Sequence, residues 1–114
     1  MKSNYTQIAN RILEALSITR MSNEETRIMY VIFRKTYGWG KKQDKIAISQ
    51  FVELAKMDRR HVSRTLKKLE KKNMIFIIKG YVNYYQFNTI QAYVKAQGTG
   101  KENVKMHQQQ LSLF

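Results

Sequence analysis

The sequence contains no cysteine, few acidic side chains and no long apolar run. Without cysteine the chain can form no disulfide and no thiolate metal site, which fits a reducing cytoplasm. No apolar run approaches the roughly 20 residues that a helix needs to cross a bilayer. The opening residues, Met1 to Asn4, lack the apolar stretch of a signal peptide. We therefore expect a cytoplasmic protein.

The scarcity of acidic side chains leaves the chain strongly basic. Eight Asp and Glu residues face 21 Lys and Arg residues, for a net charge of +13. Such a domain attracts polyanions over long range, so DNA, RNA and an anionic membrane are the candidate partners. A membrane surface is disfavoured, because no helix joins a bulky apolar face to the basic one without losing its core residues.

Residues for catalysis are also lacking. The two histidines, His61 and His107, lie far apart in the sequence, and the acidic residues are scattered. No nucleophile–base pair can be recognised, even among seven tyrosines. We expect no enzyme activity, no cofactor and no metal site.

Hydrophobic periodicity predicts a mainly α-helical domain with a small β-hairpin. Helices are expected over residues 6–18, 23–37, 50–55 and 59–72, a short strand over 45–48, β-rich runs over 74–78 and 84–87, and a further short helix over 89–96. A tight helix-turn-helix followed by a hairpin is the winged helix-turn-helix fold. The domain should span residues 1–96, and residues 97–114 should form a flexible tail.

Helix boundaries are predicted from capping residues. Ser22 followed by Glu25 forms a capping-box pattern. Ser49 and Asp58 are the expected N-caps of the next two helices, and Gly38 and Asn73 are the expected stops.

The predicted helix over residues 59–72 is the expected DNA-reading element. Val62, Leu66 and Leu69 fall on one face, as core residues would. Most of the remaining surface is basic, and the N-terminal part of a recognition helix enters the major groove. The expected DNA contacts on this helix are Arg59, Arg60, His61, Ser63, Arg64, Lys67 and Lys68. A solvated basic face is the alternative, and it is preferred for Lys71 and Lys72.

Four further residues complete the expected DNA interface. Lys79 and Tyr81 lie at the wing tip and should reach the neighbouring backbone or minor groove, unless the hairpin is simply solvated. Lys41 and Lys42, in the loop before the motif, are expected to hold a phosphate. Trp39 is interpreted as a packing residue rather than a base-stacking one.

Several segments together resemble a known family. They are Tyr5-Thr6-Gln7-Ile8-Ala9-Asn10, Arg34-Lys35-Thr36-Tyr37-Gly38-Trp39-Gly40-Lys41-Lys42, Asp44, Ile46, Ser49-Gln50, and residues 58–69. The chain resembles the N-terminal domain of phage replication protein O over residues 5–88. The resemblance implies a winged-helix domain that recognises repeated sequences in a replication origin. Full-length members also carry a C-terminal region that recruits a helicase loader, so that activity is not expected of these residues.

The final five residues suggest a second partner. Gln110, Leu111, Ser112, Leu113 and Phe114 are similar to the short motif through which bacterial proteins bind the β sliding clamp. Apolar residues on a polar tail suit insertion into a partner's pocket, and Gln110 can supply oriented hydrogen bonds. Docking of the tail on its own domain, or an accidental match, is the alternative.

Two functions remain open on the sequence. The first is a double-stranded DNA-binding protein of phage or mobile-element replication, tethered to the clamp by its tail. The second is a winged-helix transcriptional repressor, which would explain the DNA-binding motif and leave the tail idle. A homodimer on DNA is open, because the helix over residues 6–18 can serve as a dimer surface or cap the monomer core.

Overall fold

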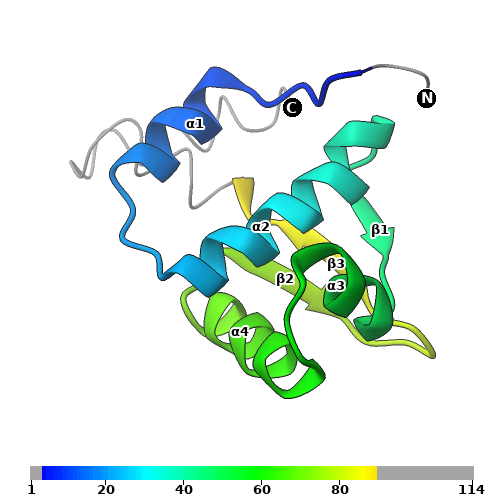
Figure 1. Ribbon diagram of the computed structural model, residues 1–114. Helices are drawn as coiled ribbons and strands as arrows, with labels where there is room; N and C mark the ends of the chain where they lie inside the picture. The colour runs from blue at the N-terminus through cyan, green and yellow to red at the C-terminus, as the bar shows by residue number, and fades with distance from the viewer. Residues whose placement is uncertain (1–3, 90–114) are drawn as a thin grey trace. The chain divides into compact units, whose positions relative to one another are not determined.

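Helices and a small antiparallel sheet make up residues 4–89, the part of the chain that this computed structural model describes (Figure 1). The elements are α1 Asn10–Ser17, α2 Asn23–Lys35, the 3-10 helix η1 Tyr37–Trp39, β1 Gln43–Lys45, α3 Ile48–Ala55, α4 Arg59–Lys71, β2 Ile75–Ile78 and β3 Tyr84–Phe87. The predicted winged helix-turn-helix fold is confirmed. The predicted helix over 89–96 and the boundary at 96/97 lie outside the described residues, apart from Thr89. No helix among residues 4–89 is long and apolar enough to span a membrane.

The described residues fall into two compact units. Residues 4–7 and 21–87 belong to the first, and residues 8–20, 88 and 89 to the second. Within the second unit, α1 begins at Asn10, four residues later than predicted, and buries Ile12 and Ala15. Leu13, next to the buried Ile12, is exposed. The hydroxyls of Ser17 and Thr19 donate to the carbonyls of Glu14 and Ala15, which satisfies acceptors at the end of the helix.

The capping box predicted at the start of α2 is confirmed. The Glu25 amide donates to Ser22 Oγ at 3.1 Å, and the Ser22 amide donates to Glu25 Oε1 at 2.8 Å. From there α2 runs through the first unit and packs against α3, α4 and β3 (Figure 1). Its inward residues are Ile28, Met29, Val31, Ile32 and Phe33, all buried. This helix is therefore the axis of the hydrophobic core.

The end of α2 differs from the prediction. The helix stops at Lys35, two residues before the predicted end at Tyr37, and Gly38 lies inside η1 instead of ending the helix. A Cβ at Gly38 would lie 3.0 Å from Arg34 Nη1 and 3.1 Å from Thr6 Oγ1, so glycine is needed here for close approach. Thr6 therefore lies beside η1, outside α1.

The start of α3 is also corrected. Ser49 was expected as the N-cap, but the helix begins at Ile48 and Ala47 is the N-cap residue. The Gln50 side chain accepts the Ala47 amide at 2.9 Å, so a residue inside the helix satisfies the orphan donor. The N-cap at Asp58 and the left-handed Asn73, with φ of 60°, agree with the prediction.

The sheet has three strands in the order β1-β3-β2, all antiparallel. The sequence predicted the β2–β3 hairpin; β1 covers Gln43–Lys45 rather than 45–48 and adds a third strand beside β3. Inward-facing Tyr85 and Phe87 make edge-on ring contacts with Phe51 and Phe33, at 5.1 and 5.2 Å between centroids. These contacts fix the sheet against α2 and α3.

One ion pair joins the start of α2 to the end of α4. Lys72 Nζ lies 2.9 Å from Oε1 and 2.8 Å from Oε2 of Glu25, whose side chain is only 3% exposed. Lys72 was expected to be solvated; its side chain is 46% exposed and also pairs with Glu25, because the fold brings the two helix ends together. Burial raises the pKa of Glu25, but the hydrogen bonds from Lys72 and from the Ser22 amide outweigh burial and lower it below 4.5.

We predict that Lys72→Met destabilises the fold by about 1–2 kcal/mol at neutral pH, because it leaves a buried carboxylate without its charged donor. Since the folded-state pKa of Glu25 is lowered, its contribution is complete above the unfolded pKa and is lost as pH falls through the folded value. Urea unfolding at several pH values measures both effects. In Glu25→Gln this acid-dependent component should be missing; an unchanged pH profile would contradict the assignment.

Candidate nucleic-acid interface

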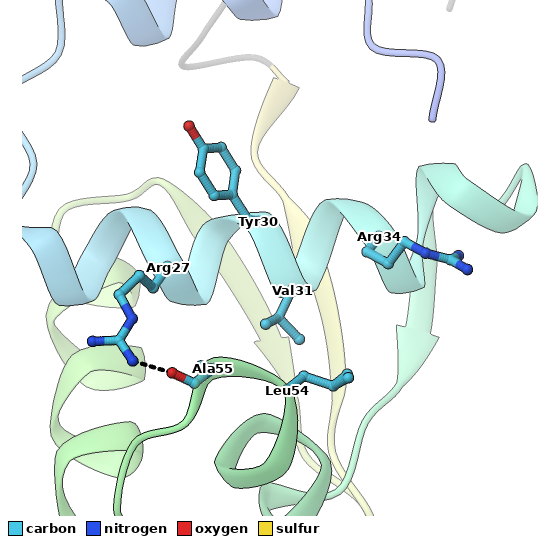
Figure 2. Close-up of a pocket in the computed structure, with 6 residues that line it drawn as sticks. All are labelled: Arg27, Tyr30, Val31, Arg34, Leu54 and Ala55. Atoms are coloured by element: carbon cyan, nitrogen blue, oxygen red, sulfur yellow. Dashed lines mark hydrogen bonds between the residues drawn. The ribbon is translucent and has the colours of Figure 1, made fainter. Parts of the chain in front are cut away.

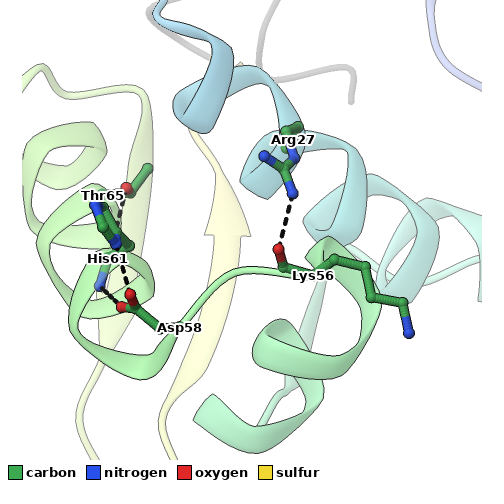
Figure 3. A network of polar contacts seen from close by, with 5 residues as sticks. All are labelled: Arg27, Lys56, Asp58, His61 and Thr65. Carbon is green, nitrogen blue, oxygen red and sulfur yellow. Dashed lines mark hydrogen bonds and ion pairs between the residues drawn. The ribbon is translucent and has the colours of Figure 1, made fainter.

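The turn between α3 and α4 is held by a residue from α2. Lys56 ends α3 in a left-handed conformation, with φ of 54°, and Met57 is buried beneath the turn. The Arg27 guanidinium donates to the carbonyl of Ala55 (Figure 2) and to that of Lys56, the latter at 3.1 Å (Figure 3). Those carbonyls lie at the end of α3 and otherwise lack helical partners. Arg27 thus ties α2 to the turn that leads into α4.

Asp58 starts α4 with two hydrogen bonds to the same residue. Its Oδ1 accepts the His61 amide at 2.8 Å, and its Oδ2 lies 2.9 Å from His61 Nδ1 (Figure 3). The backbone hydrogen bond, followed by the side-chain one, lowers the pKa of Asp58. Thr65 Oγ1 in turn donates to the His61 carbonyl at 2.7 Å. His61, an expected DNA contact, therefore has its Nδ1 facing the cap and is exposed on its other side.

The outward face of α4 is a stripe of cations. Arg60, Arg64, Lys67 and Lys71 recur at helical spacing opposite the buried Val62, Thr65, Leu66 and Leu69. All four are exposed, with Arg59, His61 and Lys68 exposed on the flanks and Ser63 half-buried. Within residues 4–89, the structure shows no ion pair for Arg64, Lys67, Lys68 or Lys71. We call Arg60, Arg64, Lys67 and Lys71 the α4 stripe.

The hairpin exposes two of the expected DNA-contacting residues to solvent. Tyr81, at the tip of the loop between β2 and β3, is fully exposed, and Lys79 is exposed beside it. The Gly80 amide donates to Asn83 Oδ1 at 3.2 Å and closes the loop. The loop therefore presents Lys79 and Tyr81 on a hydrogen-bonded turn.

Lys41 and Lys42 are not brought to the wing tip. Because Lys45 pairs with Tyr84 and Gln43 with Gln86, the residues before β1 lie at the end of the sheet away from the hairpin loop. Lys41 Nζ lies 3.4 Å from Asp44 Oδ1, and Lys42 is exposed. Trp39, expected to be a packing residue, is 45% exposed, and the Arg34 guanidinium lies 5.8 Å from its ring centroid.

A hollow of about 320 Å³ lies between side chains of α2 and α3 (Figure 2). Its lining residues are Arg27, Tyr30, Val31, Arg34, Leu54 and Ala55. Arg27 is engaged there with the Ala55 carbonyl, while Tyr30 and Leu54 are exposed. None of the residues expected to contact DNA lines this hollow, so it is separate from the α4 stripe.

Two residues that matter to this interface escaped the sequence analysis. Arg27 acts on carbonyls 28 and 29 positions away, and no local pattern marks it. Lys71 was expected to be merely solvated, but its spacing from Arg60, Arg64 and Lys67 could have assigned it to the stripe. The candidate interface therefore combines a predicted face of cations with a supporting arginine that the sequence did not predict.

Comparison with known proteins supplies the family. The family model described as bacteriophage replication protein O matches residues 1–93. Replication protein 15 of Enterobacteria phage phi80 is 34% identical over 76 residues, which is 67% of this chain and 25% of that protein. Replication protein O of Escherichia phage lambda is 31% identical over 75 residues, 66% of this chain and 22% of that protein. The chain thus spans about a quarter of the length of these relatives.

A solved structure supports the fold. The crystal structure of MepR, a transcription regulator of the Staphylococcus aureus multidrug efflux pump MepA, matches with a TM-score of 0.50 and 15% sequence identity. The match covers 91% of this chain and 76% of MepR. At this identity the likeness concerns the fold alone.

We predict that Arg27→Met lowers stability by about 1–3 kcal/mol, since charge-assisted hydrogen bonds to the end of α3 are lost. Chemical denaturation measures the effect. Arg34→Met is the matched control, because Arg34 is an exposed arginine on the same helix without those carbonyl contacts. Equal losses in the two variants would show that Arg27 has no special role at the turn.

Proposed function

The chain belongs to the bacteriophage replication protein O family, and from that premise we propose that it binds double-stranded DNA during phage replication. The proposed act is recognition of a duplex site, for origin binding or control of initiation. The α4 stripe carries this proposal, because it is a row of exposed cations on the second helix of a helix-turn-helix. Like charges at this spacing repel one another, and phosphates or base edges would relieve that repulsion.

The residues divide into two roles. Arg59, Arg60, Ser63 and Arg64, near the start of α4, are proposed to reach base edges in the major groove, where arginine can bind guanine O6 and N7 together. His61, Lys67 and Lys68 are proposed to contact phosphates. Lys79 and Tyr81 would reach the adjacent DNA backbone or minor groove. Lys41 and Lys42 would hold phosphates at the N-terminal end of β1, away from the hairpin loop.

A second part of the proposal concerns the tail. Gln110, Leu111, Ser112, Leu113 and Phe114 are proposed to bind the bacterial β sliding clamp and so tether the DNA-bound domain to a replication machine. These residues lie outside the described part of the structure, and the proposal is supported by their sequence. The two activities are separable, so each has its own test.

For DNA binding, we predict that Arg64→Gln weakens binding to a selected duplex by about 1–3 kcal/mol, roughly 5- to 150-fold. Binding of the unaltered protein should fall by roughly 10³ or more between about 50 and 200 mM salt if six or more phosphates are contacted. Lys45→Gln removes the same charge from the sheet and is the matched control. Similar losses in both variants, or a flat salt response, would argue against α4 as the reading helix.

Mapping the bound sites distinguishes replication from repression. Genomic footprinting should find repeated sites within a replication origin. Sites confined to promoters, with element replication unaffected by loss of the protein, would instead support the winged-helix repressor.

For the tail, we predict that replacing Leu113 and Phe114 by Ala abolishes binding to an immobilised β sliding clamp, since the apolar side chains that fill a partner's pocket are lost. Duplex affinity should not change. Replacing Gln108 and Gln109 by Ala is the control within the same tail. Clamp binding that survives the Leu113–Phe114 change, or no clamp binding by the unaltered protein, would refute the tether.

A further inference from the structure

The outer face of the sheet exposes large apolar side chains. Phe76 is 44% exposed, Ile78 41% and Tyr84 37%, whereas the inward Ile75 and Tyr85 are 1% and 2% exposed. Alternation along a strand explains why the sheet has a buried and an exposed face. It does not explain why aromatic and branched residues lie on the exposed face, which is usually polar. Within the first unit, α2 and α4 pack on the sheet where the buried side chains lie, and no element of that unit covers the outer face.

The strand register places these side chains together. Ile78, Tyr84 and Lys45 form one row across the three strands, and Phe76, Gln86 and Gln43 form the next. Residues paired across antiparallel strands share a face, and diagonal neighbours are within reach of aromatic side chains. We call these six residues the outer sheet face. It presents the aromatic rings of Phe76 and Tyr84 beside polar side chains that can form hydrogen bonds.

Its charge selects the occupant. Lys45 lies in the Tyr84 row of the outer sheet face, whereas Lys79 follows Ile78 at the alternate position, beyond the end of β2. Asp44, the acidic residue of β1, occupies the alternate position in that strand and lies near Lys41. The outer sheet face therefore combines stacking surfaces with positive charge and carries no acidic side chain of its own.

We infer that the outer sheet face binds single-stranded DNA, with bases stacked on Phe76 and Tyr84 and phosphates near Lys45. Aromatic platforms in basic surroundings bind single strands with little sequence preference, because every base has a flat face that can stack. A second copy of the chain is a poorer occupant, since it would bring another net charge of +13 and another Lys45 to the same patch. The inference goes beyond duplex binding and uses different residues; it takes only the choice of DNA over RNA from the proposed function.

The test is binding of the full chain to a fluorescent 12-nucleotide oligo(dT), followed by anisotropy. Phe76→Ala and Tyr84→Ala should each weaken binding about 5- to 100-fold, from the loss of one stacked base. Phe76→Trp should retain binding, whereas Phe76→Leu, which keeps apolar area without a ring, should lose it. Tyr30→Ala removes a tyrosine that is 66% exposed on α2 and should have no effect.

Two further measurements separate this inference from the proposed duplex site. Oligo(dT) carrying 5-bromodeoxyuridine should crosslink on irradiation to peptides containing Phe76 or Tyr84. Arg64→Gln should weaken duplex binding far more than oligo(dT) binding, and Phe76→Ala should do the reverse.

Several outcomes would overturn the inference. They are absence of oligo(dT) binding, equal loss with Tyr30→Ala, crosslinks confined to α4, and tighter binding to oligo(rU) than to oligo(dT). Conversion of a dimer to a monomer by Phe76→Ala, with oligo(dT) binding unchanged, would assign the face to a second copy instead. Duplex binding could persist in every one of these cases, so failure here is distinguishable from failure of the proposed function.

Discussion

The buried carboxylate of Glu25 is the constraint on which the winged helix depends. It accepts the Ser22 amide at the start of α2 and the Lys72 ammonium at the end of α4, 47 positions away in the sequence. Removing either partner would leave a charge in a nearly water-free position. The Glu25 side chain therefore holds both the first turn of α2 and the end of α4. Arg27, on the next part of α2, fixes the turn at the other end of α4 through the carbonyls that close α3.

This arrangement explains how so basic a chain presents its charge. Three of the few acidic side chains are engaged internally: Glu25 and Asp58 at helix starts, and Asp44 beside Lys41. The α4 stripe is left without ion pairs among the described residues, on a helix whose two ends are held from α2. An exposed row of cations that is already held in position is suited to a polyanion. Binding then neutralises the charges, and the helix does not have to be ordered at the same time.

Local chemistry explains what the sequence could predict. The caps at Ser22 and Asp58, the cation spacing on α4 and the hairpin all depend on residues within a few positions of one another. Contacts between distant residues explain the rest. The sequence did not predict the Glu25–Lys72 ion pair, the hydrogen bond from Arg27 to Ala55 or the pairing of β1 with β3. The close approach of Thr6 to Gly38 is likewise a distant contact. The start of α3 is an exception, since the Gln50 side chain accepts the amide of Ala47, only three positions away. The DNA-contacting residues remain predictions, because the structure positions them without a bound duplex.

The central claim is that the outward face of α4 meets the duplex. The most direct measurement is NMR of the arginine side-chain Nε–Hε signals during titration with a duplex selected from a random pool. The account predicts large shifts for Arg60 and Arg64, with Arg27 and Arg34 nearly unchanged. Shifts concentrated at Arg27 and Arg34, around the hollow between α2 and α3, would contradict it and place the DNA on another face.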